Sequence, residues 1–253
     1  MPVKQKTLNK NPYSVRKVDI LGVPFDVLTE KEALMRLRSF LNESKNHIVI
    51  TPNPEGVMMT KRNPDFRQAV KNADLLLADG IGILLASRLI KTPIPNRVTG
   101  TDITSAFFKC LSKKRGATAY FLGAAPGIAQ KARENIEKRY PGVRVIGCHH
   151  GYFNQEEEQV ILSEIKQLQP EILLVCTGMP RAEIWAQKHR NLPVKITMCL
   201  GGALDIFAGN VRRAPAVMRR AGLEWLYRLV SQPSRAKRML DLPLFVFTVL
   251  RNR

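Results

Sequence analysis

The stretch ATAYFLGAAPGIAQKARENIEKRYPGVRVIGC (117–148) decides the fold. It opens with the apolar run 117–123, continues through an amphipathic segment at 125–139 and closes with a second apolar run at 143–148. A buried strand, a helix and another buried strand in this order are typical of a βαβ unit with parallel strands. The sequence therefore predicts an α/β protein.

The same alternation extends along the chain in both directions. Further apolar runs lie at 47–51, 74–78, 171–178 and 194–202, and further amphipathic segments at 31–44, 101–114, 155–169 and 181–190. The runs show little internal alternation, as expected of strands buried on both faces. Residues 18–28 instead alternate around Gly22 and Pro24, which predicts a small N-terminal hairpin. We expect a Rossmann-like, mostly parallel sheet flanked by helices.

Composition excludes several classes of protein. The chain has 253 residues, 45% hydrophobic and 24% charged, which is typical of a globular protein and not of disorder, collagen or a coiled coil. Its four cysteines form no CxxC pair, so neither a disulfide scaffold nor a zinc ribbon is indicated. The pair His149 and His150 has no metal-ligand spacing around it. We expect no metal and no cofactor.

Positive charge is concentrated at the two ends. The net charge is +19, of which residues 1–17 carry +5 and residues 212–253 carry +8. This distribution predicts a basic N-terminal arm (1–17), an α/β core (18–210) and a basic helical appendage (211–253), with a polyanionic partner. No secretory signal is visible in the first 17 residues.

The C-terminal segment combines basic and apolar residues. The apolar stretch 242–250 spans roughly 14 Å as a helix, too short for a hydrocarbon core of about 30 Å. Two interpretations are open: an interfacial helix on anionic lipid, or a helix packed on the core with its arginines in solvent. The charge excess favours the membrane, and nothing resembles a motif that reads nucleic acid.

Polar and glycine-rich turns follow the predicted strands at one edge, where parallel sheets bind ligands. Asp79 and Gly80 follow the run 74–78; the carboxylate is either a helix N-cap or a general base toward a sugar hydroxyl. Arg97 is either a turn residue or a phosphate ligand. The other candidate binding residues of these turns are Thr51, Asn53, Asp102, Gly123, Gly127, Gly178, Arg181, Glu183, Gly201, Gly202 and Asp205.

These segments together resemble the WecG/TagA/CpsF glycosyltransferases, also called glycosyltransferase family 26. The matching motifs run in family order over about residues 18–240. They are TPNPEGVMMTKRNPDFRQAVKNADLLLADGIGILLASR (51–88), RVTGTD (97–102), FLGAAPG (121–127), GMPRAE (178–183), GGALDIFAGNVRRAP (201–215) and GLEWLYRL (222–229). Each motif alone is weak, but the ordered set is specific.

The resemblance implies an inverting, metal-independent transfer from a UDP-sugar to an undecaprenyl-diphosphate-linked sugar. In the TagA branch, N-acetylmannosamine goes to the 4-hydroxyl of N-acetylglucosamine, which makes the linkage unit of wall teichoic acid. The resemblance makes Asp79 the general base, places Thr51 and Asn53 near the reacting sugars and puts Arg97 on the diphosphate. It assigns the lipid diphosphate to Arg228, Arg235 and Arg238. It also implies a peripheral enzyme on the cytoplasmic face of the membrane. The oligomeric state is open, and a homo-oligomer is one of the options.

One position departs from the family pattern. Ala182 stands where the family usually has Gln before the Glu of this motif, so the donor sugar is open between N-acetylmannosamine, N-acetylmannosaminuronic acid and glucose. Two other classes remain as alternatives. A dinucleotide-dependent oxidoreductase would use Gly80 and Gly82 but lacks the third glycine, and a nucleic-acid-binding protein would use the basic ends.

Overall fold

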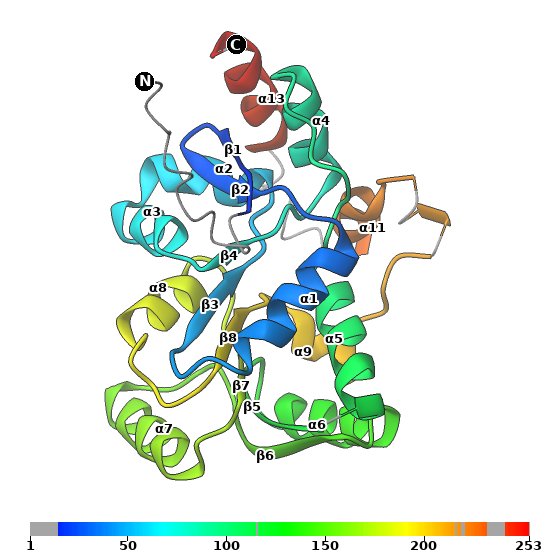
Figure 1. Ribbon diagram of the computed structural model, residues 1–253. Helices are drawn as coiled ribbons and strands as arrows, with labels where there is room; N and C mark the ends of the chain where they lie inside the picture. The colour runs from blue at the N-terminus through cyan, green and yellow to red at the C-terminus, as the bar shows by residue number, and fades with distance from the viewer. Residues whose placement is uncertain (1–14, 115, 216, 219–220, 232–240, 253) are drawn as a thin grey trace, which may run out of the picture.

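A computed structural model describes residues 15–114, 116–215, 217–218, 221–231 and 241–252. Its centre is a six-stranded sheet in the order β4-β3-β8-β7-β5-β6, in which every paired strand is parallel (Figure 1). The strands are β3 (His47–Ile50), β4 (Leu75–Leu76), β5 (Ala117–Gly123), β6 (Val143–His149), β7 (Ile172–Cys176) and β8 (Ile196–Cys199). The predicted α/β class and mostly parallel sheet are confirmed.

Helices cover both faces of the sheet (Figure 1). The residues buried against one face come from α2 (Pro54–Arg62), α3 (Pro64–Lys71), α4 (Ile81–Leu89), α7 (Gln155–Leu168), α8 (Arg181–Lys188) and α13 (Asp241–Arg251). Those against the other face come from α1 (Glu30–Phe40), α5 (Gly100–Lys114), α6 (Ile128–Arg139) and α9 (Ala203–Phe207). The strands are sandwiched between these layers, which is why they lack a polar face.

Strand β7 shows the double burial residue by residue. Leu173 and Val175 join the core on one face, while Leu174 and Cys176 join the core on the other. All of them are buried. The apolar run that predicted this strand is continuous because its side chains enter the hydrophobic cores on both faces of the sheet.

The N-terminal hairpin pairs β1 (Lys17–Ile20) with β2 (Val23–Asp26) in antiparallel register, as predicted. Its turn needs Gly22, whose φ is +90°. Asp26 is buried, pairs with Lys17 at 2.9 Å and accepts the Leu76 N–H at 2.8 Å. The hairpin is therefore tied to edge strand β4 through a buried carboxylate.

Strand β4 is shorter than the predicted run 74–78. Only Leu75 and Leu76 pair with β3, which is the one neighbour of this edge strand. Beyond the ladder the backbone stays beside β3, and the Asp79 N–H donates to the Pro52 carbonyl at 3.2 Å. This contact brings the end of the 74–78 segment to the end of β3.

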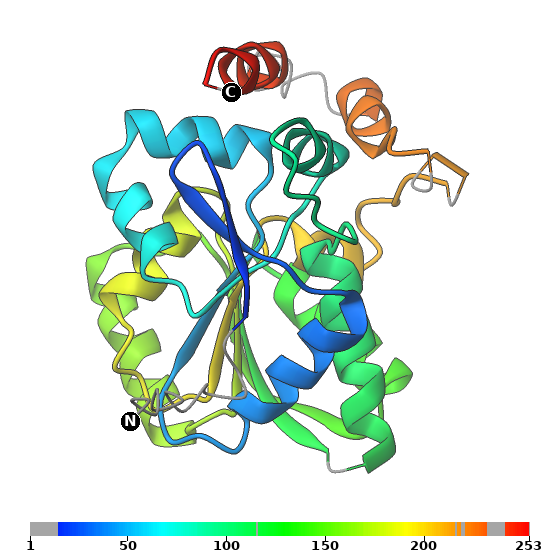
Figure 2. The ribbon, with the colours of Figure 1, turned by 45° about the horizontal axis from the view of Figure 1, so that its top comes forward.

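The C-terminal helix α13 packs on the core and also exposes apolar side chains. Phe245 and Val249 are 1% and 2% exposed, whereas Phe247 is 62% exposed. Figure 2 shows α13 at the same end of the molecule as α4 and α11 (Glu224–Ser231). One face of α13 is therefore packed on the core, as one interpretation predicted, and the opposite face leaves apolar side chains exposed. In the described part of the chain, no helix has both the length and the apolar character to cross a bilayer.

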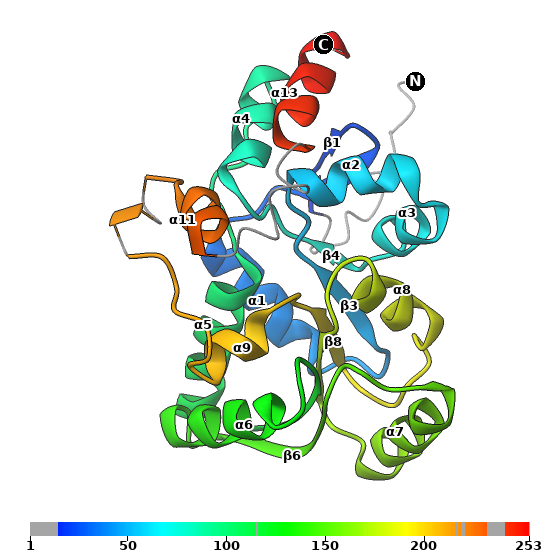
Figure 3. The ribbon, with the colours of Figure 1, turned by 180° about the vertical axis from the view of Figure 1, so that it is seen from behind.

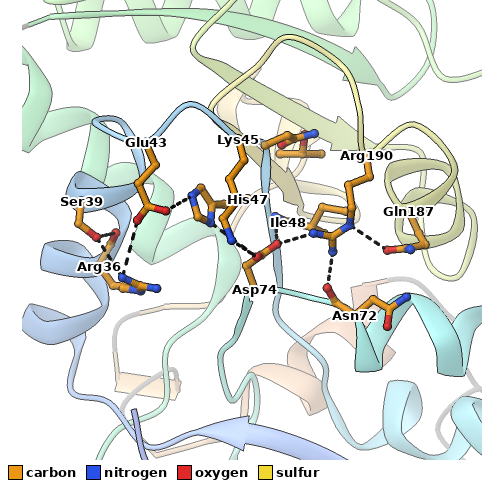
Figure 4. A network of polar contacts seen from close by, with 12 residues as sticks. Arg36, Ser39, Glu43, Lys45, His47, Ile48, Asn72, Asp74, Gln187 and Arg190 are labelled. Atoms are coloured by element: carbon orange, nitrogen blue, oxygen red, sulfur yellow. Dashed lines mark hydrogen bonds and ion pairs between the residues drawn. The ribbon is translucent and has the colours of Figure 1, made fainter. Parts of the chain in front are cut away.

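A polar network closes the opposite, N-terminal edge of the sheet (Figure 4). His47 is 1% exposed and stacks on Phe40, and its ring nitrogens lie 3.0 Å from Glu43 and 3.6 Å from Asp74. Asp74 also accepts the Ile48 N–H at 3.0 Å and pairs with Arg190 at 2.9 Å. Burial by itself raises the pKa of Asp74, but these hydrogen bonds and the guanidinium hold that pKa well below its usual range.

We expect Asp74→Asn to lower the free energy of unfolding at neutral pH by about 2 kcal/mol, since it weakens charge-assisted hydrogen bonds. In the wild type, a lowered pKa in the folded state contributes stability above the unfolded value of about 3.9 and loses it as pH falls below that value. Urea unfolding at neutral and acid pH should show a weaker acid dependence in the variant. The exposed Glu134→Gln is the control, and an equal acid dependence in Asp74→Asn would contradict the prediction.

Candidate active site

A pocket of about 210 Å³ opens at the carboxyl edge of the sheet. The helices that follow β3 and β8 leave toward opposite faces, because α2 joins one hydrophobic layer and α9 the other. Such a switch point leaves a crevice between neighbouring strands. The pocket is lined by Thr51, Asp79, Thr99, Gly100, Thr101, Leu200, Gly202, Ala203, Asp205, Ile206, Val211, Arg212, Arg213, Ala214 and Glu224.

Thr51 follows β3, Asp79 lies three residues after β4, and both residues line this pocket. Gly80 follows Asp79 with a φ of +99° and caps α4, and a Cβ there would lie 3.5 Å from Pro54. This sharp turn directs the chain from the strand into α4 immediately after the carboxylate. Asn53 does not line the pocket: its side chain caps α2 by accepting the Gly56 N–H at 2.9 Å.

The start of α5 forms another wall. A Cβ on Gly100 would lie 2.9 Å from a Leu200 methyl and 3.0 Å from the Thr51 hydroxyl, so glycine allows the helix to approach both strands. Thr99 donates to Asp102 at 2.7 Å. Gly100 and Thr101, at the start of this 15-residue helix, line the pocket, and the helix dipole at this end favours anions.

Two ion pairs cross from the core to the segment that follows residue 210. Arg213 donates to Asp102 through both terminal nitrogens, at 2.6 and 2.9 Å. Arg97 lies 3.4 Å from Glu224 of α11. Arg97 and Asp102 are among the residues predicted from the sequence, whereas their partners Arg213 and Glu224, which line the pocket, are not. In the sequence, Arg213 and Glu224 are marked only by their place inside the motifs 201–215 and 222–229.

The predicted glycine-rich turn after β5 lies outside the lining of this pocket. Gly123 sits where β5 passes β7, and a Cβ there would lie 2.4 Å from the Cys176 carbonyl carbon. Gly127 caps α6 with a φ of +82°. Close strand contact and a helix cap account for both glycines. Gly178 and Gly201 also have positive φ values and are absent from the pocket lining.

The motif 178–183 is divided between surface and core. Arg181 is exposed, lies over the Phe153 ring at 4.6 Å and donates to the Phe153 carbonyl. Ala182 is fully buried, so a polar side chain at this position would face the core. Glu183 is buried with one carboxylate oxygen lacking a hydrogen-bond partner in the structure, and burial raises its pKa to about 7. None of these side chains lines the pocket.

The other predicted residues lie in three places: at the pocket, in α11 and outside the described residues. Gly202 and Asp205 line the pocket, and Asp205 accepts the Asn210 amide at 3.2 Å. Arg228 belongs to α11, while Arg235 and Arg238 lie outside the described residues, as does most of the basic arm 1–17. Over the described ranges, no group of three His, Cys, Asp or Glu side chains could hold a metal ion.

A parallel α/β sheet with a polar, arginine-containing pocket at its switch point is the Rossmann-like arrangement in which such folds bind their ligands. The profile of the glycosyl transferase WecG/TagA/CpsF family matches residues 18–253, and the chain belongs to this family. It is therefore a glycosyltransferase.

Two curated relatives carry the name N-acetylglucosaminyldiphosphoundecaprenol N-acetyl-beta-D-mannosaminyltransferase. The protein from Bacillus spizizenii strain W23 is 35% identical over 216 residues, which cover 85% of this chain and 82% of the relative. The protein from Staphylococcus aureus strain MRSA252 is 31% identical over 240 residues, which cover 94% of this chain and 93% of the relative.

Proposed function

We propose that this enzyme transfers N-acetylmannosamine from UDP-N-acetylmannosamine to the 4-hydroxyl of N-acetylglucosamine linked to undecaprenyl diphosphate. The observation that carries the proposal is the pocket that holds Asp79 and Thr51 beside Arg213, in a member of this family. The names of the relatives support the donor sugar and the acceptor. The product would be the linkage unit of wall teichoic acid or of a related surface polymer.

The proposed mechanism is a single displacement. The acceptor hydroxyl attacks the anomeric carbon as its proton passes to the Asp79 carboxylate, and the bond from that carbon to the UDP oxygen breaks. Attack opposite to the leaving group inverts the anomeric centre. Arg97, Arg213 and the α5 N-terminus would stabilise the negative charge that develops on UDP, so the step requires no metal ion.

We further propose that the enzyme works on the cytoplasmic face of the cell membrane. The acceptor is a lipid, and the outer face of α13 leaves Leu244, Val246, Phe247 and Leu250 45–62% exposed. Basic residues of the C-terminal segment complement anionic headgroups. We expect the lipid diphosphate to meet Arg228, Arg235 and Arg238 there.

The test is acceptor-dependent UDP release from UDP-N-acetylmannosamine, with lipid-diphosphate-linked N-acetylglucosamine in detergent or anionic vesicles. We expect release to persist in EDTA, because arginines and helix N–H groups take the role of a metal. Loss of release in EDTA, restored by a divalent cation, would refute metal independence alone. No release under any condition would refute this donor and acceptor.

Two other sugar donors remain as alternatives because of Ala182. Its burial places the methyl group in the core, so the family's polar contact at this position is missing. UDP-N-acetylmannosaminuronic acid and UDP-glucose should therefore be assayed in parallel. Faster release from either one would reassign the donor and leave the transferase mechanism unchanged.

A further inference from the structure

Two ion pairs join the core to residues of the segment after residue 210, and the core residue is the anion in one pair and the cation in the other. The core supplies the anion in one pair, Asp102 with Arg213, and the cation in the other, Arg97 with Glu224. Arg213 and Glu224 both line the pocket that holds Asp79. The charges that attach this segment to the core therefore lie at the pocket itself.

The backbone fixes Glu224 in position. It is 7% exposed and lies in the first turn of α11, two residues after Gly222. Gly222 has a φ of +75°, and a Cβ there would lie 3.1 Å from Ile81, the first residue of α4. The residues before α11 thus pack closely against the start of α4. Figure 3 shows α11 between the levels of α4 and α5.

Arg213 carries a donor without a partner. Asp102 takes its two terminal nitrogens, but its Nε–H is buried and makes no hydrogen bond in the described structure. The hydrogen bonds that Arg213 donates to Asp102 raise the pKa of Arg213, and the charges of Glu224 and Asp79 act in the same direction. A permanently charged guanidinium with a buried, unused donor is arranged for an anionic ligand, because leaving such a group unpaired costs about 1–3 kcal/mol.

Carboxylates and phosphates pair with arginine through the same geometry of N–H and oxygen groups. Glu224 now makes the pairing with Arg97 that a phosphate would make. A diphosphate bound between Arg97 and Arg213 would also lie close to the Glu224 carboxylate, and like charges in a partly buried pocket repel strongly. The two anions therefore compete for Arg97.

We propose that Arg97 and Arg213 form a diphosphate site whose place Glu224 holds in the structure, and that a bound diphosphate displaces Glu224 and releases the start of α11 from the core. This inference rests on the proposed function. It makes Glu224 an internal competitor and Asp102 a positioning residue for Arg213. The diphosphate belongs either to the UDP donor or to the polyprenyl acceptor.

The test is calorimetric binding of UDP, farnesyl diphosphate and uridine to wild type and Glu224→Gln. We expect the variant to bind at least fivefold more tightly the diphosphate that uses this site, and to bind uridine with unchanged affinity. Arg213→Gln should bind the same diphosphate at least tenfold more weakly, again with uridine unchanged. Glu134→Gln, an exposed change of equal charge on α6, controls for net charge.

Trp225 provides a second readout, since it follows Glu224 in α11 and is 38% exposed. The competing diphosphate should change tryptophan fluorescence in wild type and leave it unchanged in Trp225→Phe. If wild type binds the diphosphates but Glu224→Gln binds neither more tightly, the Glu224 proposal is refuted and the proposed function stands. If wild type binds neither UDP nor farnesyl diphosphate, both proposals are refuted.

Discussion

Asp79→Asn should lower acceptor-dependent UDP release by about 10²–10⁴-fold, the usual contribution of a general base. The amide has nearly the same shape but cannot take the proton of the attacking hydroxyl. Gly80 and the contact from the Asp79 N–H to Pro52 are unchanged, so the backbone should remain in place. UDP affinity should not weaken, because the change removes a negative charge from a pocket that binds an anion.

The control is Asp65→Asn, the same chemical change at an exposed residue in the first turn of α3. It should retain wild-type release. Both variants need a single-turnover measurement with bound UDP-sugar, which separates the chemical step from binding. Retention of more than about a tenth of the wild-type rate in Asp79→Asn would assign the proton to another group.

The strands and the edge at which the pocket opens could be predicted because they depend on local pattern. The run 117–123 coincides with β5, since its residues are buried on both faces. Asp79 and Thr51 could be placed near one another because parallel strands end at one edge. The hairpin followed in the same way from alternation around Gly22.

Charge pairing across the chain could not be predicted in this way. Asp102 and Arg213 are 111 residues apart, and the sequence shows two charges without their contact. In the sequence, Glu224 is one of two acidic residues in a basic segment. Nothing there indicates that it is buried and paired with Arg97. Pairing of this kind depends on how α11 docks, and docking depends on contacts such as Gly222 against Ile81.

The glycine-rich turn after β5 shows that the role of a glycine cannot be assigned from the sequence alone. Gly123 and Gly127 stand between a strand and a helix, where a glycine-rich turn can bind a ligand, yet the pocket lies at β3, β4 and β8. Gly123 is needed because Cys176 of β7 passes within contact distance. A glycine required by a distant strand has the same sequence signature as a glycine required by a ligand.

Phe245 and Phe247 of α13 should separate folding from membrane attachment, because they are the same residue type on opposite faces of one helix. Phe245 is 1% exposed and lies near Gly82, where an added Cβ would be 3.9 Å from its ring. We expect Phe245→Ala to lower the free energy of unfolding by about 3–5 kcal/mol, the usual cost of an emptied phenylalanine site. Urea unfolding measures this loss.

Phe247 is 62% exposed, so Phe247→Ser should leave the unfolding free energy unchanged. Burial of a phenylalanine side chain is worth about 1.5–3 kcal/mol, so its removal from a lipid-facing surface should weaken partitioning into anionic vesicles about tenfold or more. Sedimentation with phosphatidylglycerol vesicles measures the partitioning, and zwitterionic vesicles separate the apolar from the electrostatic contribution. Equal partitioning of Phe247→Ser and wild type would show that α13 does not enter the bilayer. The basic residues alone would then have to hold the enzyme at its lipid acceptor.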